Sequence, residues 1–241
     1  MADYSKPDHF ALKAQKEGYP ARSVYKLKEM DDKFGLIKPG RFPFRVLDLG
    51  AAPGSWSLYV LRKLSGHSGG RGGSRSSQAP DALPVSATPP VSLVSVDLSP
   101  LSRQYDQGLF DKPAPAAEDR QNRGSFPAFL FIQGDFTLPD IREAILSHGP
   151  YNLLISDAAP ATAGNRSLDT LRSLELAETA LYYAETTLAK GGNLVVKVFQ
   201  GGDTAALLKT IRGLFETGKS FKPQACRAES FETYYLGLGK K

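Results

Sequence analysis

The chain contains six short runs of apolar residues, each bounded by polar residues, glycine or proline. They lie at residues 45–49, 92–98, 129–133, 151–156, 193–199 and 233–238. The runs are nearly continuous in apolar residues rather than alternating with polar ones, a pattern typical of strands covered on both faces. We therefore expect each run to be a strand of a mostly parallel sheet.

Helical periodicity precedes the first run and fills several of the later intervals. The expected helices cover residues 23–34, 55–64, 168–188 and 204–215. Ser23 is placed as the N-cap of the first helix and Gly35 as its stop, and the third helix is expected to stop at the glycines 191–192. Strands that alternate with helices predict a doubly wound α/β sheet.

Two stretches interrupt this alternation. Residues 65–90 hold five glycines, six serines and four prolines without apolar periodicity, so they cannot bury enough surface to offset the entropy of ordering. Residues 101–127 carry more charge and contain Pro113 and Pro115. We expect both stretches to be flexible surface insertions in a domain that covers residues 45–241.

Positive charge is concentrated before that domain. The formal net charge is +5, and residues 1–45 hold ten lysines and arginines against six acidic residues. A basic flank with interspersed aromatic side chains suits a polyanion such as RNA, and a solvated basic helix is the alternative that charge leaves open. Residues 1–44 are expected to form a basic N-terminal segment with a helix.

The composition narrows the class of protein. At 241 residues and 41% hydrophobic content, the chain can bury one core, as a single α/β domain does. No apolar run reaches the roughly 20 residues of a membrane span. The first ten residues do not resemble a signal peptide, which favours a cytoplasmic protein without a membrane partner. Cys226 is the single cysteine and the three histidines lie far apart, so we expect no disulfide and no metal site.

A glycine turn follows the first strand run. It reads DLGAAPG over residues 48–54, which differs from the Gly-x-Gly-x-x-Gly turn of pyrophosphate binders. Pro53 has no backbone N–H to offer a phosphate, whereas Gly54 lets the backbone approach a ligand closely. The turn therefore favours a ligand without phosphate groups, such as the methionine end of S-adenosylmethionine.

Carboxylates follow the next two strand runs. Asp97 lies 47 residues after Gly50, or 21 residues after it when the 26 residues of the first insertion are set aside. In nucleoside-binding α/β folds, the carboxylate that holds the ribose hydroxyls lies about 20 residues after the glycine turn. Asp135 follows the third run, where it could accept a hydrogen bond from an adenine amino group beside Phe136. Both residues are predicted to bind a nucleoside.

Five motifs occur in order between residue 22 and the C-terminus. They are RSVYKLKE at 22–29, DLGAAPGSWS at 48–57, SDAAP at 156–160, VVKVFQG at 195–201 and RAESFETY at 227–234. Together they resemble the FtsJ/RlmE family of ribose methyltransferases, which modify the 2′-hydroxyl of a nucleotide in RNA. The chain departs from the bacterial pattern at Ser55, where a second glycine is usual, and at Ala158, Ala161 and Thr162, where the loop is commonly bulkier and more polar.

The resemblance implies a fold, a cofactor and a site. The implied fold is a single-domain Rossmann-like methyltransferase with a mostly parallel seven-stranded sheet, and the implied cofactor is S-adenosylmethionine. The implied catalytic residues are Lys26, Asp157, Lys197 and Glu232. The implied cofactor-binding residues are Gly54, Trp56, Asp97, Asp135 and Asp157. In this assignment Lys197 is central, while Lys26 and Glu232 hold the target ribose and orient Lys197.

Two roles are open for Lys197. Its apolar strand favours a neutral amine that could take the proton of the 2′-hydroxyl, whereas the nearby Asp157 favours an ammonium group. Lys197 is then either a general base, or a cation that orients the 2′-oxygen while water accepts the proton. A buried ion pair contributes little net stability, so a purely structural role accounts less well for the pair.

The resemblance also favours a substrate. We expect the protein to methylate a ribose in the 23S ribosomal RNA of an assembled large ribosomal subunit. We expect the modified nucleotide to be a uridine and the protein to be a monomer. A tRNA ribose or an mRNA cap is the closest alternative. The four charged residues argue against a noncatalytic RNA-binding assembly factor, and the DLGAAPG turn argues against a nicotinamide oxidoreductase.

Overall fold

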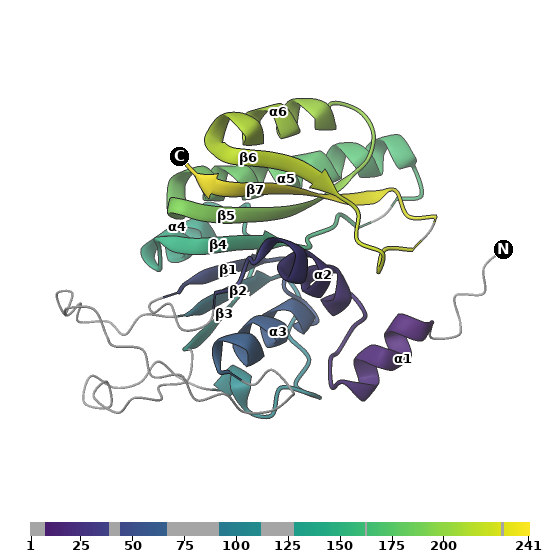
Figure 1. The fold of residues 1–241 in the computed structure, drawn as a ribbon, viewed down its shortest axis with the longest axis vertical. Helices are drawn as coiled ribbons and strands as arrows, with labels where there is room; N and C mark the ends of the chain where they lie inside the picture. The colour runs from purple at the N-terminus through teal and green to yellow at the C-terminus, as the bar shows by residue number, and fades with distance from the viewer. Residues whose placement is uncertain (1–7, 39–43, 67–91, 112–127, 162, 228) are drawn as a thin grey trace.

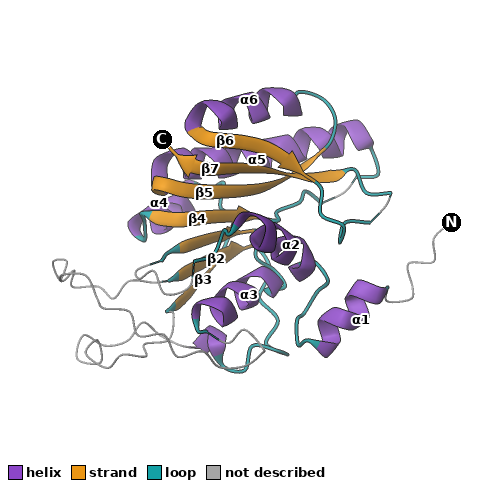
Figure 2. Ribbon diagram, viewed as in Figure 1, coloured by secondary structure: helices purple, strands orange, loops and turns teal. Residues whose placement is uncertain are grey.

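One sheet organises the part of the chain that the computed structural model describes, which is residues 8–38, 44–66, 92–111, 128–161, 163–227 and 229–241. Its seven strands run in the order β3-β2-β1-β4-β5-β7-β6, with helices on both faces (Figures 1 and 2). The strands are β1 (Val46–Leu49), β2 (Leu93–Asp97), β3 (Phe129–Gln133), β4 (Tyr151–Ser156), β5 (Leu188–Phe199), β6 (Phe215–Phe221) and β7 (Glu232–Lys240). The helices are α1 (His9–Lys16), α2 (Val24–Phe34), α3 (Ser55–Leu64), η1 (Leu109–Asp111), α4 (Pro139–Ser147), α5 (Arg166–Thr187) and α6 (Thr204–Leu214).

The sheet is mostly parallel. Strands β3, β2, β1, β4 and β5 pair in parallel, and β7 pairs antiparallel with both β5 and β6. The carboxyl ends of the parallel strands therefore meet at one edge, and the amino end of β7 joins them there. The expected single-domain, Rossmann-like α/β fold with seven strands is confirmed.

Sequence patterning found the buried strands and missed the exposed elements. All six apolar runs are strands, although β5 begins at Leu188, five residues before its run. The seventh strand, β6, escaped the pattern because it is an edge strand whose middle residues are exposed or only partly buried. The short helices α1 and α4 were also not predicted, and each buries a single residue, Ala14 and Ile145 respectively.

Ser23 is the N-cap residue of α2 and Gly35 its C-cap, as predicted, but Ser23 has helical backbone angles and its side chain makes no capping hydrogen bond. The predicted end of the third helix was wrong. The helix α5 ends at Thr187 without a glycine, and Gly191 and Gly192 lie inside β5. There the pairing of β4 and β5 shifts register, and a Cβ on Gly192 would lie 2.8 Å from the carbonyl oxygen of Ala189. Gly192 thus allows a close backbone approach at an irregular strand pair, and Gly191 supplies a positive φ of 76° beside it, so neither residue stops a helix.

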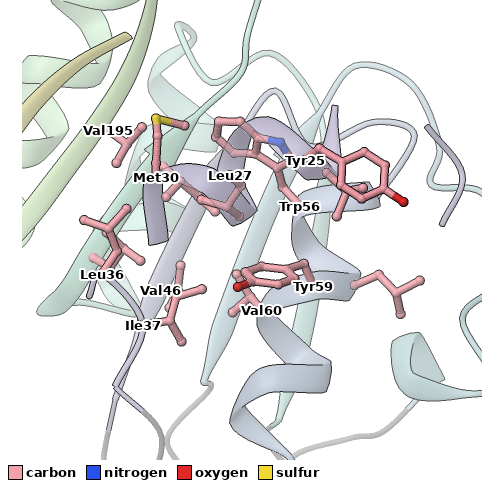
Figure 3. Close-up of a cluster of buried hydrophobic side chains, with 14 of the residues drawn as sticks. Tyr25, Leu27, Met30, Leu36, Ile37, Val46, Trp56, Tyr59, Val60 and Val195 are labelled. Atoms are coloured by element: carbon pink, nitrogen blue, oxygen red, sulfur yellow. The ribbon is translucent and has the colours of Figure 1, made fainter. Parts of the chain in front are cut away.

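The core consists of two apolar clusters, one on each face of the sheet. Figure 3 shows the cluster under α2 and α3, in which Leu27 and Met30 lie against Val195 of the sheet and Trp56 of α3. Val24, Leu27 and Met30 are fully buried. The helix of the basic N-terminal segment is thus built into the same core as the sheet.

The two expected insertions are described only in part. Of residues 65–90, all but Ser65 and Gly66 lie outside the described residues. Of residues 101–127, the part up to residue 111 is packed rather than loose, because Phe110 is buried and stacks on Phe129 of β3. The backbone N–H of Ser102 also donates to the carbonyl oxygen of Pro53, 3.0 Å away. This segment therefore braces the glycine turn.

Within the described part of the chain, no helix is both long enough and apolar enough to cross a bilayer.

Asp31 ties α2 to α3, which yields a test of how strongly the N-terminal helix is held. Its buried carboxylate accepts hydrogen bonds from the backbone N–H of Ile37 (2.9 Å) and the hydroxyl of Tyr59 (2.8 Å), and it pairs with Lys63. We expect Asp31→Ala to lower the free energy of unfolding by about 3 kcal/mol, because two buried donors and the partly buried amine of Lys63 lose their acceptor. Urea denaturation measures the change.

Asp32→Ala is the matched control for that variant. Asp32 is exposed on the same helix, so its removal should change the free energy of unfolding by less than about 0.5 kcal/mol. Equal denaturation midpoints for the two variants would contradict the role assigned to Asp31.

Candidate active site

A buried ion pair lies at the edge of the sheet where the parallel strands end. The amine of Lys197 on β5 is 3.2 Å from Oδ1 of Asp157, which directly follows β4. The same amine donates to the backbone carbonyl oxygen of Asp157 at 2.5 Å. The two side chains are only 7% and 17% exposed, so both charges are largely removed from water and depend on each other.

Tyr234 completes the environment of Asp157. Lys197 and Tyr234 face each other across the antiparallel pair of β5 and β7, and the tyrosine hydroxyl donates to Oδ1 of Asp157 at 2.6 Å. Tyr234 belongs to the last of the five sequence motifs, but no role was predicted for it. The signal was present, because Glu232 and Tyr234 are two residues apart and share one face of β7.

A second ion pair adjoins the first. The amine of Lys26, on the first turn of α2, lies 2.7 Å from Oε1 of Glu232, the first residue of β7. The Lys26 amine is also 6.0 Å from the centre of the Tyr234 ring. The four residues predicted as catalytic therefore lie together around Tyr234. They come from four places far apart in the sequence: α2, the loop after β4, β5 and the start of β7.

The charges in this group shift one another's protonation. Burial by itself would raise the pKa of Asp157, but the positive charges of Lys197 and Lys26 and the hydrogen bond from Tyr234 hold it below its usual value. Burial would lower the pKa of Lys26, but the negative charges of Asp157 and Glu232 raise it. All of these contacts favour the charged forms of Asp157 and Lys26 at neutral pH.

The glycine turn after β1 touches the Asp157 loop. Gly50 has a backbone φ of 75°, and a Cβ at this position would lie 2.5 Å from the Cα atom of Ala158. Gly54, with φ 102°, precedes α3, and its added Cβ would lie 3.1 Å from the ring of Phe110. Glycine is required at both positions, by backbone conformation and by close approach.

The predicted nucleoside carboxylates lie at the same edge of the sheet. Asp97 ends β2, and its oxygens accept hydrogen bonds from the backbone N–H groups of Ala52 (2.9 Å) and Ser99 (2.8 Å). Asp135 follows β3, and its Oδ1 accepts from the backbone N–H and the hydroxyl of Thr137. Each carboxylate is thus oriented by its own loop, and Asp97 also shapes the glycine turn.

Trp56 lies apart from the other predicted cofactor residues. Its side chain is only 2% exposed, its indole N–H donates to the carbonyl oxygen of Ser23 at 2.8 Å, and its ring lies 5.9 Å from that of Tyr234. The side chain therefore supports Tyr234 and α2 from within the core. The backbone N–H of Trp56 lies in the first turn of α3, where the helix supplies no acceptor.

Asp48 was quoted in the glycine motif without a role. It is buried at the third position of β1, and its Oδ2 accepts a hydrogen bond from Ser57 at 2.7 Å. Among the described residues its Oδ1 has no hydrogen-bond partner. Burial raises the pKa of Asp48 to about 7 against the effect of the Ser57 hydrogen bond, and the charges of Asp157 and Asp97 raise it further. Its carboxyl group is therefore partly protonated near neutral pH, which reduces the repulsion between carboxylates in this region.

The donor set suits S-adenosylmethionine better than a metal or a pyrophosphate. Carboxylates border a glycine turn that contains a proline, which fits a cationic, hydroxyl-bearing ligand. In the part of the chain that the structure describes, no three His, Cys, Asp or Glu residues gather as a metal site would require.

The glycine turn, the carboxylates at the strand ends and the Lys197 pair together characterise a methyltransferase site, and comparison with known proteins agrees. The FtsJ-like methyltransferase family matches residues 19–240. The chain belongs to this family. A relative in Treponema denticola, named ribosomal RNA large subunit methyltransferase E, is 44% identical over 238 residues, which are 99% of this chain and 97% of the relative.

Two solved structures share the fold of this FtsJ-like methyltransferase. One is a Plasmodium falciparum protein described as a ribosomal RNA methyltransferase, with a TM-score of 0.60 and 22% identity, covering 92% of this chain and 98% of that one. The other is human methyltransferase-like protein 13 in complex with SAH, with a TM-score of 0.52 and 11% identity, covering 89% of this chain and 82% of that one. The methyl donor of the chain is S-adenosylmethionine, as the resemblance implied.

The contact between Gly50 and Ala158 predicts a loss of cofactor binding on substitution. Gly50→Ala adds a methyl group that collides with the Asp157 loop, so we expect affinity for S-adenosylmethionine, measured by calorimetry, to fall at least about tenfold. Gly191→Ala is the control, because Gly191 has a similar φ of 76° and no heavy atom within 4 Å of an added Cβ in the described structure. Equal affinity in the two variants would show that the close approach is unimportant.

The hydrogen bond from Tyr234 predicts a change in the pH dependence of stability. Tyr234→Phe removes one cause of the lowered pKa of Asp157, so this pKa should rise toward its usual value. A carboxyl group with a lowered pKa stabilises the fold at pH values above its unfolded pKa and loses this contribution as the pH falls through its folded pKa. We expect the variant to be less stable by about 1–3 kcal/mol at pH 7. The deficit should shrink below about pH 4.

Tyr235→Phe is the control for that measurement, because Tyr235 packs on the opposite face of the sheet. Denaturation curves between pH 3 and pH 8 are compared for both variants, a range chosen to span the usual pKa of Asp at about 4. A deficit of Tyr234→Phe that does not vary with pH would argue against a link to Asp157.

Proposed function

We propose that the chain is an RNA ribose methyltransferase that transfers a methyl group from S-adenosylmethionine to a 2′-hydroxyl of large-subunit ribosomal RNA. The observation that carries the proposal is the buried set of Lys197, Asp157, Lys26 and Glu232 at the strand edge beside the glycine turn. The relative in Treponema denticola, by its name, supports the ribosomal substrate. We extend the proposal to a uridine of 23S ribosomal RNA on the resemblance alone.

We assign the cofactor to the residues around the turn. Asp97 would hold the ribose hydroxyls and Asp135 the adenine amino group, while Gly54 and the backbone N–H of Trp56 would face the methionine end. Asp157 would lie close to the positive charge. When bound, S-adenosylmethionine supplies an electrophilic methyl group on a sulfonium.

We place the target 2′-hydroxyl next to Lys197. The amine of Lys197 donates to the backbone carbonyl oxygen of Asp157 and lies 3.2 Å from its Oδ1, so it is placed as a hydrogen-bond donor beside a carboxylate. Lys197 therefore acts as a cation that orients the 2′-oxygen for attack and stabilises the charge left when its proton goes to water. Lys26 and Glu232 hold the ribose. The general-base role of Lys197 is the alternative that the following variants separate.

The proposed setting follows from the substrate. The enzyme works in the cytoplasm, as a monomer, on an assembled large ribosomal subunit. The start of helix α2, which carries Lys26 and Lys28, faces the RNA. A tRNA substrate or a noncatalytic role in ribosome assembly would each give a different result in the assay below.

The direct test is transfer of tritium from labelled S-adenosylmethionine to RNA. Large subunits from a strain that lacks the gene are compared with naked tRNA, and the labelled nucleoside is identified. We expect a 2′-O-methylated nucleoside in the large-subunit RNA, and a loss of at least about 100-fold in rate with Lys197→Ala. Label on tRNA alone would replace the substrate, and no label on either RNA would favour the noncatalytic role.

Two further variants refine that test. Lys209→Ala is the control, because Lys209 is an exposed lysine on α6 away from the strand edge, and its rate should equal that of the wild type. Lys197→Arg keeps the charge but cannot act as a base at ordinary pH. Substantial residual activity of Lys197→Arg would exclude the general-base role.

A further inference from the structure

Three side chains on or just before α2 bind the loop that leads into β7. Arg22 lies just before the helix, and Lys26 and Glu29 follow at spacings of four and three residues, which place all three side chains on the same side. Each of the three contacts a residue between positions 224 and 232. The contacts join parts of the chain about two hundred residues apart, as the separations of 203 and 195 residues for Arg22 and Glu29 show.

Arg22 and Glu29 bind the backbone of this loop. The carboxylate of Glu29 accepts hydrogen bonds from the backbone N–H groups of Gln224 (2.7 Å) and Ala225 (2.9 Å). The guanidinium of Arg22 donates to the carbonyl oxygen of Ala225 at 2.5 Å. Both polar backbone groups of Ala225 are thus satisfied by α2, which allows this residue to be completely buried.

The far end of the loop is held by the sheet. The backbone N–H of Gln200, after β5, donates to the carbonyl oxygen of Phe231 at 2.8 Å, and the next residue is Glu232. Lys26, one turn before Glu29 on α2, then meets Glu232. The helix therefore holds the loop backbone and one end of the catalytic ion pair at the same time.

We propose that Glu29 is a positioning residue for the reaction, which fixes Gln224 and Ala225 of the loop before β7 on α2 so that Glu232 reaches Lys26 beside Asp157. A carboxylate is needed for this task, because it accepts two N–H bonds at once. In Glu29→Gln the amide keeps one acceptor oxygen and turns an NH₂ group toward the second N–H, so the loop loses a contact and meets a repulsive one. The catalytic part of the inference rests on the proposed function.

The single cysteine reports the loop position without any assay of activity. Cys226 is buried and directly follows Ala225, whose backbone groups bind Glu29 and Arg22. Burial and the charge of Glu232 raise the pKa of its thiol to about 12, so it should react slowly with thiol reagents. We expect Glu29→Gln to increase the rate of labelling of Cys226 by a disulfide reagent at least about tenfold, because local opening exposes the thiol.

Kinetics then separate positioning from a general loss of structure. We expect Glu29→Gln to lower kcat for RNA methylation about 10- to 100-fold while the affinity for S-adenosylmethionine, measured by calorimetry, is unchanged. In a Glu232→Gln background the same substitution should change kcat less than about threefold, because a residue that acts through Glu232 has nothing left to position. Glu175→Gln, at an exposed glutamate of α5, should match the wild type in every measurement.

The outcomes are decisive in each direction. Unchanged labelling of Cys226 in Glu29→Gln would overturn the inference, as would faster labelling with an unchanged kcat. An equal loss of kcat in the presence and absence of Glu232 would assign Glu29 to folding alone and also overturn it. If the wild type failed to methylate any RNA, the proposed function and the catalytic part of the inference would fall, and the labelling rates would still decide whether Glu29 holds the loop.

Discussion

The pairing of Lys197 with Asp157 is the constraint on which the arrangement of the site depends. Charges this far removed from water cost several kcal/mol each unless neighbouring groups compensate them. The compensation comes from the hydroxyl of Tyr234, the backbone carbonyl of Asp157 and the second pair formed by Lys26 and Glu232. Each compensating group requires a particular register, above all the antiparallel pairing that places Lys197 opposite Tyr234.

The same constraint explains the small residues around the glycine turn. Gly50 and Ala158 bring the loop after β1 against the loop after β4, and these two strands are neighbours at the centre of the sheet. The crevice at the carboxyl ends of such strands is where α/β folds bind ligands. Asp48, whose pKa is raised to about 7, can take up a proton here, which reduces the repulsion among the neighbouring carboxyl groups.

Helix α2 links the basic N-terminal segment to the chemistry. Its apolar side is part of the core, its Asp31 is bonded to α3, and its polar side supplies Lys26 to the site. Net charge alone suggested an RNA-binding flank, and the packing adds a contact, because the helix brings Lys26 to Glu232 in the proposed catalytic set. A segment that looked like an appendage in composition is thus part of the candidate site.

Continuous apolar runs and motif spacing are local properties, so they were enough to predict six of the strands, the family motifs and the four charged residues. They could not reveal β6, an edge strand with few apolar residues, nor the role of Gly192 on β5, where an added Cβ would lie 3.2 Å from the carbonyl oxygen of Asn152 on β4. Three contacts became visible only in the folded chain. Tyr234 donates a hydrogen bond to Asp157, the Trp56 side chain lies in the core, and Glu29 accepts a hydrogen bond from Ala225. Those contacts join residues far apart in the chain, and protonation states such as that of Asp48 depend on the burial and neighbouring charges that folding creates.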